Sequence, residues 1–115
     1  EVVASCNGQL ACSVAILAAD RLNQDKGKNY GSGVVFRGAK AIDKTLVVGI
    51  DIPAYAPLLP AKNGKGPKQQ IRDILVRGTC RGPEMQQFFN AGGILQVQTY
   101  LPSGEVFSND KVRRC

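Results

Sequence analysis

The sequence TLVVGIDIP, residues Thr45–Pro53, is the most strand-like stretch of the chain and decides the predicted fold. Side chains of an extended strand alternate between two faces. This stretch would therefore place four aliphatic side chains on one face, namely those of Leu46, Val48, Ile50 and Ile52. Pro53 ends the strand because it lacks the backbone N–H that a sheet needs. Such a strand is expected to bury one face against a second layer.

Two β-hairpins are predicted, each with two extended segments and a short turn between them. The four segments are Val34–Ile42, Thr45–Pro53, Ile94–Leu101 and Val106–Arg114. The first hairpin spans residues 30–53, with its turn at Ala41–Lys44 and an expected bulge at Gly38. The second hairpin turns at Pro102–Glu105.

Helical periodicity marks three other segments. Residues 12–25 are predicted to be a helix with Cys12 or Ser13 at its cap, and Pro67–Cys80 a second helix. A short third helix follows Gly82-Pro83 and ends at Asn90–Gly93, as helix C-termini often do. The apolar faces predicted to be buried are Val14, Leu17, Ala18 and Leu22 in the first helix and Ile71, Ile74, Leu75 and Gly78 in the second. The third helix carries Met85, Phe88 and Phe89, and its two phenylalanines are expected in the core.

These elements predict an α+β fold in a single domain, residues 1–115. A mainly antiparallel sheet of about four strands would form one layer, covered by two to three helices in α-β-β-α-β-β order. The composition, 43% hydrophobic without Trp, predicts an aliphatic core. No apolar run reaches the roughly 18–20 residues that cross a bilayer.

Four cysteines and no histidine occur in the chain. Cys6 and Cys12 are close in sequence, which leaves Cys80 and Cys115 for each other, although four cysteines allow three pairings. A zinc site would need CxxC pairs or histidines, so no metal is expected. Disulfides persist in oxidising compartments, so the protein is expected in a periplasm or outside the cell. The chain begins at Glu1 rather than Met, which would fit a removed signal peptide.

The net charge of +6 favours anionic partners. The basic stretch KNGKGPK, residues 62–68, lacks the Gly-x4-Gly-Lys-Ser/Thr pattern of a phosphate-binding loop. Casual anion binding at the following helix N-terminus, a protein-docking loop and a flexible solvated loop remain as alternatives. Aromatic residues do not alternate with the basic ones, so nucleic acid is not the expected partner.

Catalysis is not expected. Histidine is absent, the cysteines are predicted to be oxidised, and Asp43, Asp51 and Asp73 are not brought together by their spacing. No cofactor is predicted. The partner is expected to be a protein or an anionic envelope polymer, bound by exposed basic residues at Lys62, Lys65, Lys68, Arg77, Arg81, Arg113 and Arg114. The apolar segment AYAPLLP, residues 54–60, is the candidate anchor of that interface, or else a loop folded over the core.

The second half, ILVRGTCRGPEMQQFFNAGGILQVQTYLPSGEVFSNDKVRRC, resembles the C-terminal part of small exported bacterial proteins that contain disulfides. GVVFRGAKAIDKTLVVGIDIP resembles their first hairpin, so the likeness covers roughly residues 30–115. Among groups with a known role, the secretin pilotins of secretion systems are similar in size, export and α+β build. That resemblance implies an accessory or adaptor role in a bacterial envelope or secretion assembly, with any lipid anchor before Glu1.

The start of the chain, CNGQLAC, is similar to basic, cysteine-bridged fungal killer toxins and effectors. This resemblance supports an alternative function, a secreted basic toxin or effector, or the inhibitor or immunity protein that neutralises one.

Overall fold

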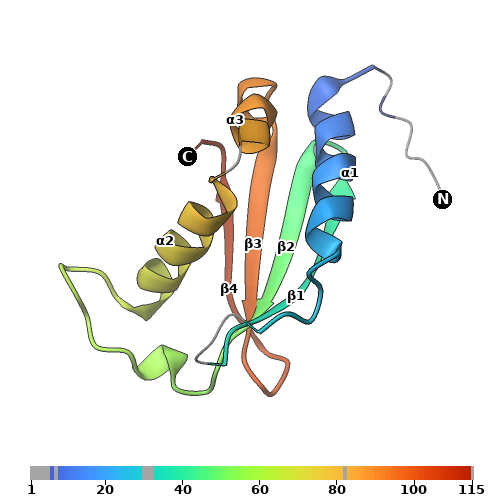
Figure 1. Cartoon of the computed structure of the whole chain (residues 1–115). Coiled ribbons are helices and arrows are strands. Elements are labelled where there is room, and N and C mark those ends of the chain that lie inside the picture. Colours follow the sequence, from blue (N-terminus) through green and yellow to red (C-terminus); the bar gives the residue numbers. More distant parts are fainter. Residues whose placement is uncertain (1–5, 7, 30–32, 82, 115) are drawn as a thin grey trace.

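The computed structural model describes residues 6, 8–29, 33–81 and 83–114. Within these residues, three α-helices lie against a four-stranded sheet with the order β1-β2-β3-β4 (Figure 1). The elements are α1 (Leu10–Asn23), β1 (Val35–Ile42), β2 (Thr45–Asp51), the short 3-10 helix η1 (Ala56–Leu58), α2 (Pro67–Thr79), α3 (Pro83–Asn90), β3 (Ile94–Tyr100) and β4 (Val106–Val112). The predicted α+β fold is confirmed, with α3 as a separate third helix.

The sheet is two antiparallel hairpins joined by a parallel pair at its centre. β1 pairs with β2 and β3 with β4 in antiparallel fashion, whereas β2 and β3 run parallel. Neighbouring parallel strands cannot be joined by a tight turn and need a long crossover. Here residues 52–93 form that crossover, which carries η1, α2 and α3.

β2 is buried on both faces, which the alternating pattern alone did not predict. Residues 46–50 are all buried. Val47 and Gly49 belong to the face without helices, where Tyr100 and Arg37 give cover. The Arg37 guanidinium lies 4.0 Å from the centroid of the Tyr100 ring, and its Nε lies 3.1 Å from Asp51 Oδ1. The predicted bulge is confirmed by a register shift between Phe36 and Gly38, where φ is 141°.

The core fills the space between the helices and the other face of the sheet. Its largest fully buried side chains are Phe88, Leu46, Leu95, Val97 and Thr99. The Thr99 hydroxyl is satisfied by a hydrogen bond with Ser108 on β4. The core is therefore largely aliphatic, as the composition predicts.

The predicted buried face of α1 is confirmed in part, because Val14, Ala18 and Leu22 are half-buried and pack against the core whereas Leu17 is exposed. The helix begins at Leu10 rather than at residue 12, with Gln9 at its N-cap and no side-chain cap, and it ends at Asn23. Its buried residues are Ala11, Cys12, Ala15 and Ala19. Small side chains let a helix approach a sheet closely, so this side faces the core. Leu17 lies on the flank of the helix and is 62% exposed.

The prediction for α2 is partly wrong. The helix spans Pro67–Thr79, and Cys80 is its C-cap. Ile71 is buried and Leu75 half-buried, but Ile74 is 60% exposed and Gly78 is exposed. The helix therefore buries a narrower stripe than its apolar pattern suggests.

α3 and its end match the prediction. Met85, Phe88 and Phe89 are buried. Gly92, with φ of 91°, donates its N–H to the Phe89 carbonyl at 2.9 Å, and Gly93 donates to the Phe88 carbonyl at 2.8 Å. These two bonds form the Schellman motif that glycine permits at a helix C-terminus.

One of the two expected disulfides lies within the described part of the chain. Cys6 and Cys12 are bonded, with their Cα atoms 5.4 Å apart. The bridge ties the residues before α1 to its first turn. Cys80 is also disulfide-bonded, and its predicted partner Cys115 lies outside the described residues.

Replacing Gly93 by Ala should destabilise the protein. A Cβ at Gly93 would overlap the ring of Phe88, which is fully buried. We expect Gly93→Ala to lower the free energy of unfolding by about 1–3 kcal/mol, because a core side chain must move. Urea unfolding measures the change. Gly78→Ala is the matched control: the added Cβ meets nothing within 4 Å, so stability should stay the same or rise by up to about 1 kcal/mol. A Gly93→Ala variant as stable as the wild type would contradict this packing.

Candidate functional site

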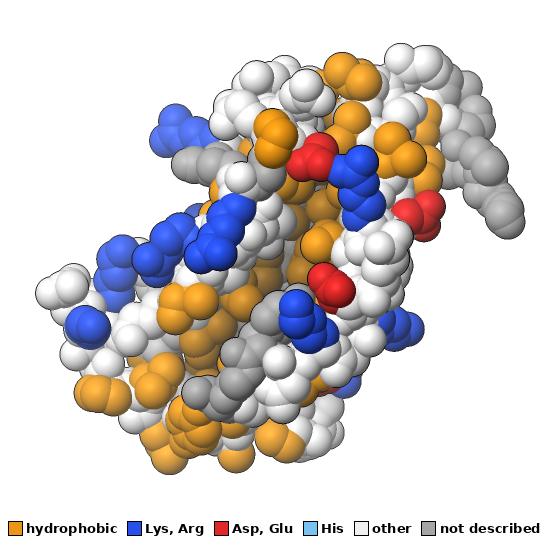
Figure 2. Space-filling view, viewed as in Figure 1, with side chains coloured by type: hydrophobic (Ala, Val, Ile, Leu, Met, Phe, Trp, Pro, Cys, Tyr) orange, Lys and Arg blue, Asp and Glu red, His pale blue; other side chains and the backbone are white. Residues whose placement is uncertain are grey.

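An apolar groove runs between α1 on one side and α2 with α3 on the other. It consists of two adjoining hollows of about 310 and 580 Å³, which share Leu22 and Thr79 in their linings. The space-filling view shows hydrophobic side chains within this hollowed region (Figure 2). We call the two hollows together the helix groove.

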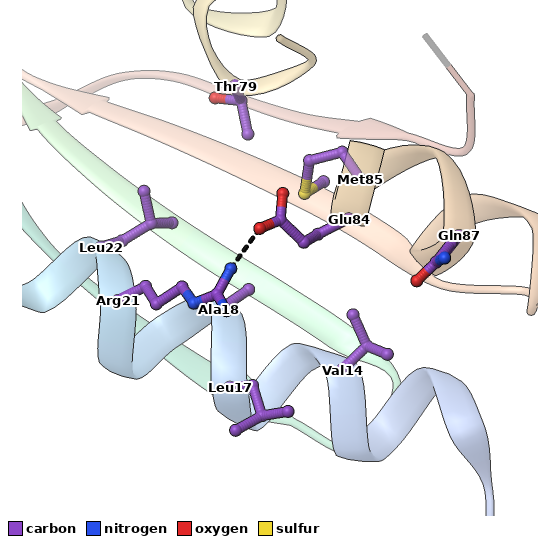
Figure 3. A pocket seen from close by; sticks show the side chains of 9 residues that line it. All are labelled: Val14, Leu17, Ala18, Arg21, Leu22, Thr79, Glu84, Met85 and Gln87. Atoms are coloured by element: carbon purple, nitrogen blue, oxygen red, sulfur yellow. Dashed lines mark hydrogen bonds and ion pairs between the residues drawn. The ribbon is translucent and has the colours of Figure 1, made fainter. Parts of the chain in front are cut away.

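The upper hollow lies between α1 and α3 (Figure 3). Its apolar lining comes from Val14, Leu17, Ala18 and Leu22 of α1 and Met85 of α3. The four α1 residues are the stripe that the sequence predicts to be buried. Val14, Ala18 and Leu22 also pack against the core, and the alanine stripe beside them is buried.

The lower hollow lies between α1 and α2, over the sheet. Phe36, Val48 and Ile50 contribute to it from β1 and β2, and all three are buried. Ile74 and Leu75 line it from α2. The hollow thus has an apolar sheet beneath it and a helix on each side.

An ion pair crosses the upper hollow. Arg21 Nη1 of α1 donates a hydrogen bond to Glu84 Oε1 of α3 (Figure 3). The two side chains are 68% and 50% exposed, so the pair contributes little to stability. Glu84 lies in the first turn of α3, where a negative charge is favoured. The pair fixes a charged point in the otherwise largely apolar upper hollow.

The pKa of Glu84 is lowered, first by a hydrogen bond from its own backbone amide and then by the charge and hydrogen bond of Arg21. On the outer side of α2, the pKa of Asp73 is also lowered. The hydrogen bond from Lys65 is the main cause, and the charges of Lys65, Arg72 and Arg77 add to it. Both carboxylates are therefore ionised at neutral pH and act as partners for basic residues.

The structure divides the predicted basic set into three groups. Arg77 and Arg81 line the lower hollow of the helix groove. Lys62, Lys65 and Lys68 belong to the connector before α2 and to its first turn. Arg113 and Arg114 follow the end of β4 and are exposed. Only the first group lies on the groove among these seven residues.

The basic stretch 62–68 forms a defined turn. Lys62 and Lys65 exchange backbone hydrogen bonds of 3.0 and 2.9 Å, and Asn63 and Gly64 between them have φ of 52° and 76°. Lys65 Nζ lies 2.7 Å from Asp73 Oδ2, and Lys68 Nζ lies 5.4 Å from the Phe107 ring centroid. The turn presents lysines beside α2.

The apolar segment 54–60 is folded back onto the body, as one of its two predicted interpretations has it, and its role as an interface anchor stays a prediction. Ala56 is 2% exposed and Leu59 packs against the core, so the segment folds back onto the body. Leu58 is nevertheless 81% exposed and Tyr55 49%.

Among the described residues, no group of three or more His, Cys, Asp or Glu side chains is placed to hold a metal ion. Within the same part of the chain, no helix is long and apolar enough to span a bilayer. Asp51 and Asp73, considered above as acids, form ion pairs with Arg37 and Lys65. The arrangement of the groove, with apolar walls and charged rims, is suited to binding.

Acid should remove the contribution of Glu84 to folding. Because the folded pKa is lowered, this contribution is present above the ordinary glutamate pKa and is lost as pH falls through the folded value. We expect Glu84→Gln to lower the urea midpoint slightly at neutral pH and to leave it unchanged in strong acid. Urea unfolding at a series of pH values measures this, with Glu105→Gln in the β3–β4 turn as the control. A pH-independent difference between Glu84→Gln and the wild type would contradict the assignment.

No family model matches the sequence, and no curated protein does. Three solved structures share the fold. A predicted secreted protein from Pseudomonas aeruginosa is 12% identical, with a TM-score of 0.73 over 96% of this chain and 95% of that one. The type II secretion system pilotin AspS from Vibrio cholerae is 18% identical, with a TM-score of 0.67 over 89% and 87%. The pilotin EpsS from the type 2 secretion system of Vibrio vulnificus is 13% identical, with a TM-score of 0.64 over 87% of each chain. The resemblance to pilotins inferred from the sequence is therefore confirmed at the level of the fold.

Proposed function

We propose that this chain is an exported, non-enzymatic accessory protein of a bacterial secretion or envelope assembly, and that it binds a helical segment of a partner protein in the helix groove. The observation that carries the proposal is the exposure of large aliphatic residues on the two walls. Leu17 of α1 is 62% exposed and Ile74 of α2 is 60% exposed. Both line the groove, one in each hollow.

A helix is the occupant that this geometry suits. A helix satisfies its own backbone hydrogen bonds, so it can lie on an apolar surface without leaving polar groups unpaired. An extended peptide would need an open strand edge, whereas α1 and α2 form the sides of the groove. An amphipathic helix would place its apolar face over Val48 and Ile50 and between the two helical walls.

The rim suggests the charge of the partner. Arg77 and Arg81 line the lower hollow, and Arg21 lies in the upper one. Arginines at the edge of an apolar groove favour carboxylates on the partner. The helix is therefore expected to carry Asp or Glu along the edge that faces α2.

The setting of the proposal rests on the fold and the disulfides. Two of the structures with this fold are pilotins of type II secretion systems, and the third is a predicted secreted protein. The Cys6–Cys12 bond supports an oxidising compartment, either a periplasm or the exterior. A secretin of the same bacterium is the first candidate partner, since the sequence resembles secretin pilotins.

Groove variants test the proposal. Leu17→Ser and Ile74→Ser should each weaken binding of the partner helix by roughly 10- to 100-fold, because a buried Leu or Ile contributes about 1.5–3 kcal/mol. Ile42→Ser is the matched control, since Ile42 is 52% exposed on β1 and does not line the groove. Overlapping peptides that tile the secretin would be titrated by fluorescence anisotropy, and the bound peptide located by NMR shift changes.

The outcomes separate clearly. Binding that is lost in both groove variants and kept in Ile42→Ser supports the groove as the site. A peptide that binds all three variants equally, or that shifts signals outside α1, α2 and α3, would contradict it. Failure of every secretin peptide would remove the secretin as partner. Normal type II secretion after deletion of the gene would remove the proposed role.

A further inference from the structure

A second exposed apolar surface lies away from the helix groove, at the end of the molecule where η1 is found (Figure 1). Leu58 is 81% exposed, the highest value among the exposed large hydrophobic residues of the described chain, and Tyr55 is 49% exposed. We call Tyr55, Leu58 and Lys62, which follows them in the same connector, the connector tip. None of the three lines either hollow of the groove.

The connector holds the tip in place. Ala56, two residues before Leu58, is 2% exposed, and Leu59 packs against the core on the other side. The Leu58 N–H donates to the Tyr55 carbonyl at 2.8 Å. The buried residues on either side of Leu58 and the hydrogen bond of η1 hold the Leu58 side chain in solvent. Leu58 is therefore exposed in the folded protein itself.

Hydrogen bonds from Gln70 of α2 hold residues 60–65 of the connector in place; we call them the clamp. The Gln70 side-chain amide donates to the carbonyls of Pro60 and Lys65, both at 2.9 Å. The turn from Lys62 to Lys65 is closed by its own pair of backbone hydrogen bonds. The clamp therefore keeps Lys62 and Lys65 at a constant position relative to η1.

The charged side chains in the sequence around the connector tip are all positive. No Asp or Glu occurs between Ile52 and Arg72, whereas Lys62, Lys65 and Lys68 all fall there. Asp73 neutralises Lys65 in part. Figure 2 shows basic side chains in a row along the α2 side of this face, and hydrophobic side chains gathered at its lower end. An apolar projection edged by lysines is complementary to a surface that is anionic outside and apolar beneath.

We propose that the connector tip contacts an anionic lipid bilayer. Leu58 and the ring of Tyr55 enter the boundary between head groups and acyl chains, and Lys62, with Lys65 and Lys68 behind it, faces the lipid phosphates. Lysine suits this place because its flexible aliphatic stem can lie along apolar surface while its ammonium stays with the head groups. Tyrosine is enriched at membrane interfaces for the same amphipathic reason.

A bilayer fits the tip better than a protein pocket does. The apolar residues project from a one-turn helix, where a soft surface can receive them without a preformed cavity. The contact is independent of the proposed function, since it uses none of the groove residues. Because η1 lies at one end of the molecule and the groove between the helices, a partner helix and a membrane can be bound together.

Vesicle sedimentation with the whole oxidised chain tests the proposal. Vesicles that contain phosphatidylglycerol should bind the protein, and vesicles of phosphatidylcholine alone should bind it much more weakly. Leu58→Ser should weaken binding to the anionic vesicles about tenfold, and Lys62→Gln about fivefold. Ile42→Ser and Lys40→Gln are the matched controls on β1 and should bind as the wild type does. Both tip residues are exposed, and circular dichroism would show that each variant is folded.

Several results would overturn the proposal. Absence of binding to anionic vesicles would do so. Equal loss in Lys62→Gln and Lys40→Gln would show that net charge alone acts, and equal loss in Leu58→Ser and Ile42→Ser would show that the tip is not the contact. Wild-type binding by Leu58→Ser, or full competition by inorganic phosphate, would show that the lysines bind free anions and that the lipid is not needed. A photo-crosslinker at position 58 that yields one protein adduct in cells, without lipid adducts, would assign the tip to a protein interface.

Discussion

The parallel pairing of β2 with β3 is the constraint on which the rest of the structure depends. Seven residue pairs, from Thr45 with Ile94 to Asp51 with Tyr100, join these strands at the centre of the sheet. Parallel neighbours require the chain to return to the end where it began. Residues 52–93 make that return, and they carry η1, the turn from Lys62 to Lys65, α2 and α3. One wall of the groove and the whole connector tip are thus parts of a single crossover.

The other wall depends on small side chains in α1. Ala11, Ala15 and Ala19 bring the helix against the sheet, which leaves the larger stripe with Leu17 on the flank. Covering Leu17 would contribute about 1.5–3 kcal/mol, a substantial part of the 5–15 kcal/mol that stabilises a typical domain. The chain forgoes this gain at Leu17, and again at Ile74 and Leu58. Such exposure at fixed positions is understandable where a partner or a membrane completes the burial.

Local rules predicted the elements well because the deciding residues act over short distances. Pro53 ends β2, Gly38 makes the bulge and Gly92 ends α3, each through its own backbone. The side of α1 that faces the sheet was not predictable in this way. Residues 10–23 carry two apolar stripes, and both have helical spacing. The choice between them depends on how closely the helix approaches β1 and β2, which is a property of the assembled layers. The presence of two apolar stripes nevertheless indicated a second apolar surface on α1, because only one of them can face the sheet.

The groove was missed for a related reason. Its lining comes from α1, α2, α3 and two strands, so it exists only after the crossover has placed them. The basic residues, in contrast, could be proposed from charge alone, and the fold separates Arg77 and Arg81, which line the groove, from the lysines of the connector and the first turn of α2. The planar guanidinium groups in the groove can bind carboxylates in pairs, and the flexible ammonium groups of Lys62, Lys65 and Lys68 can follow lipid phosphates. Residues 52–93 contain six basic and two acidic residues, so four of the six net positive charges of the chain belong to the crossover that holds the connector tip and one wall of the groove.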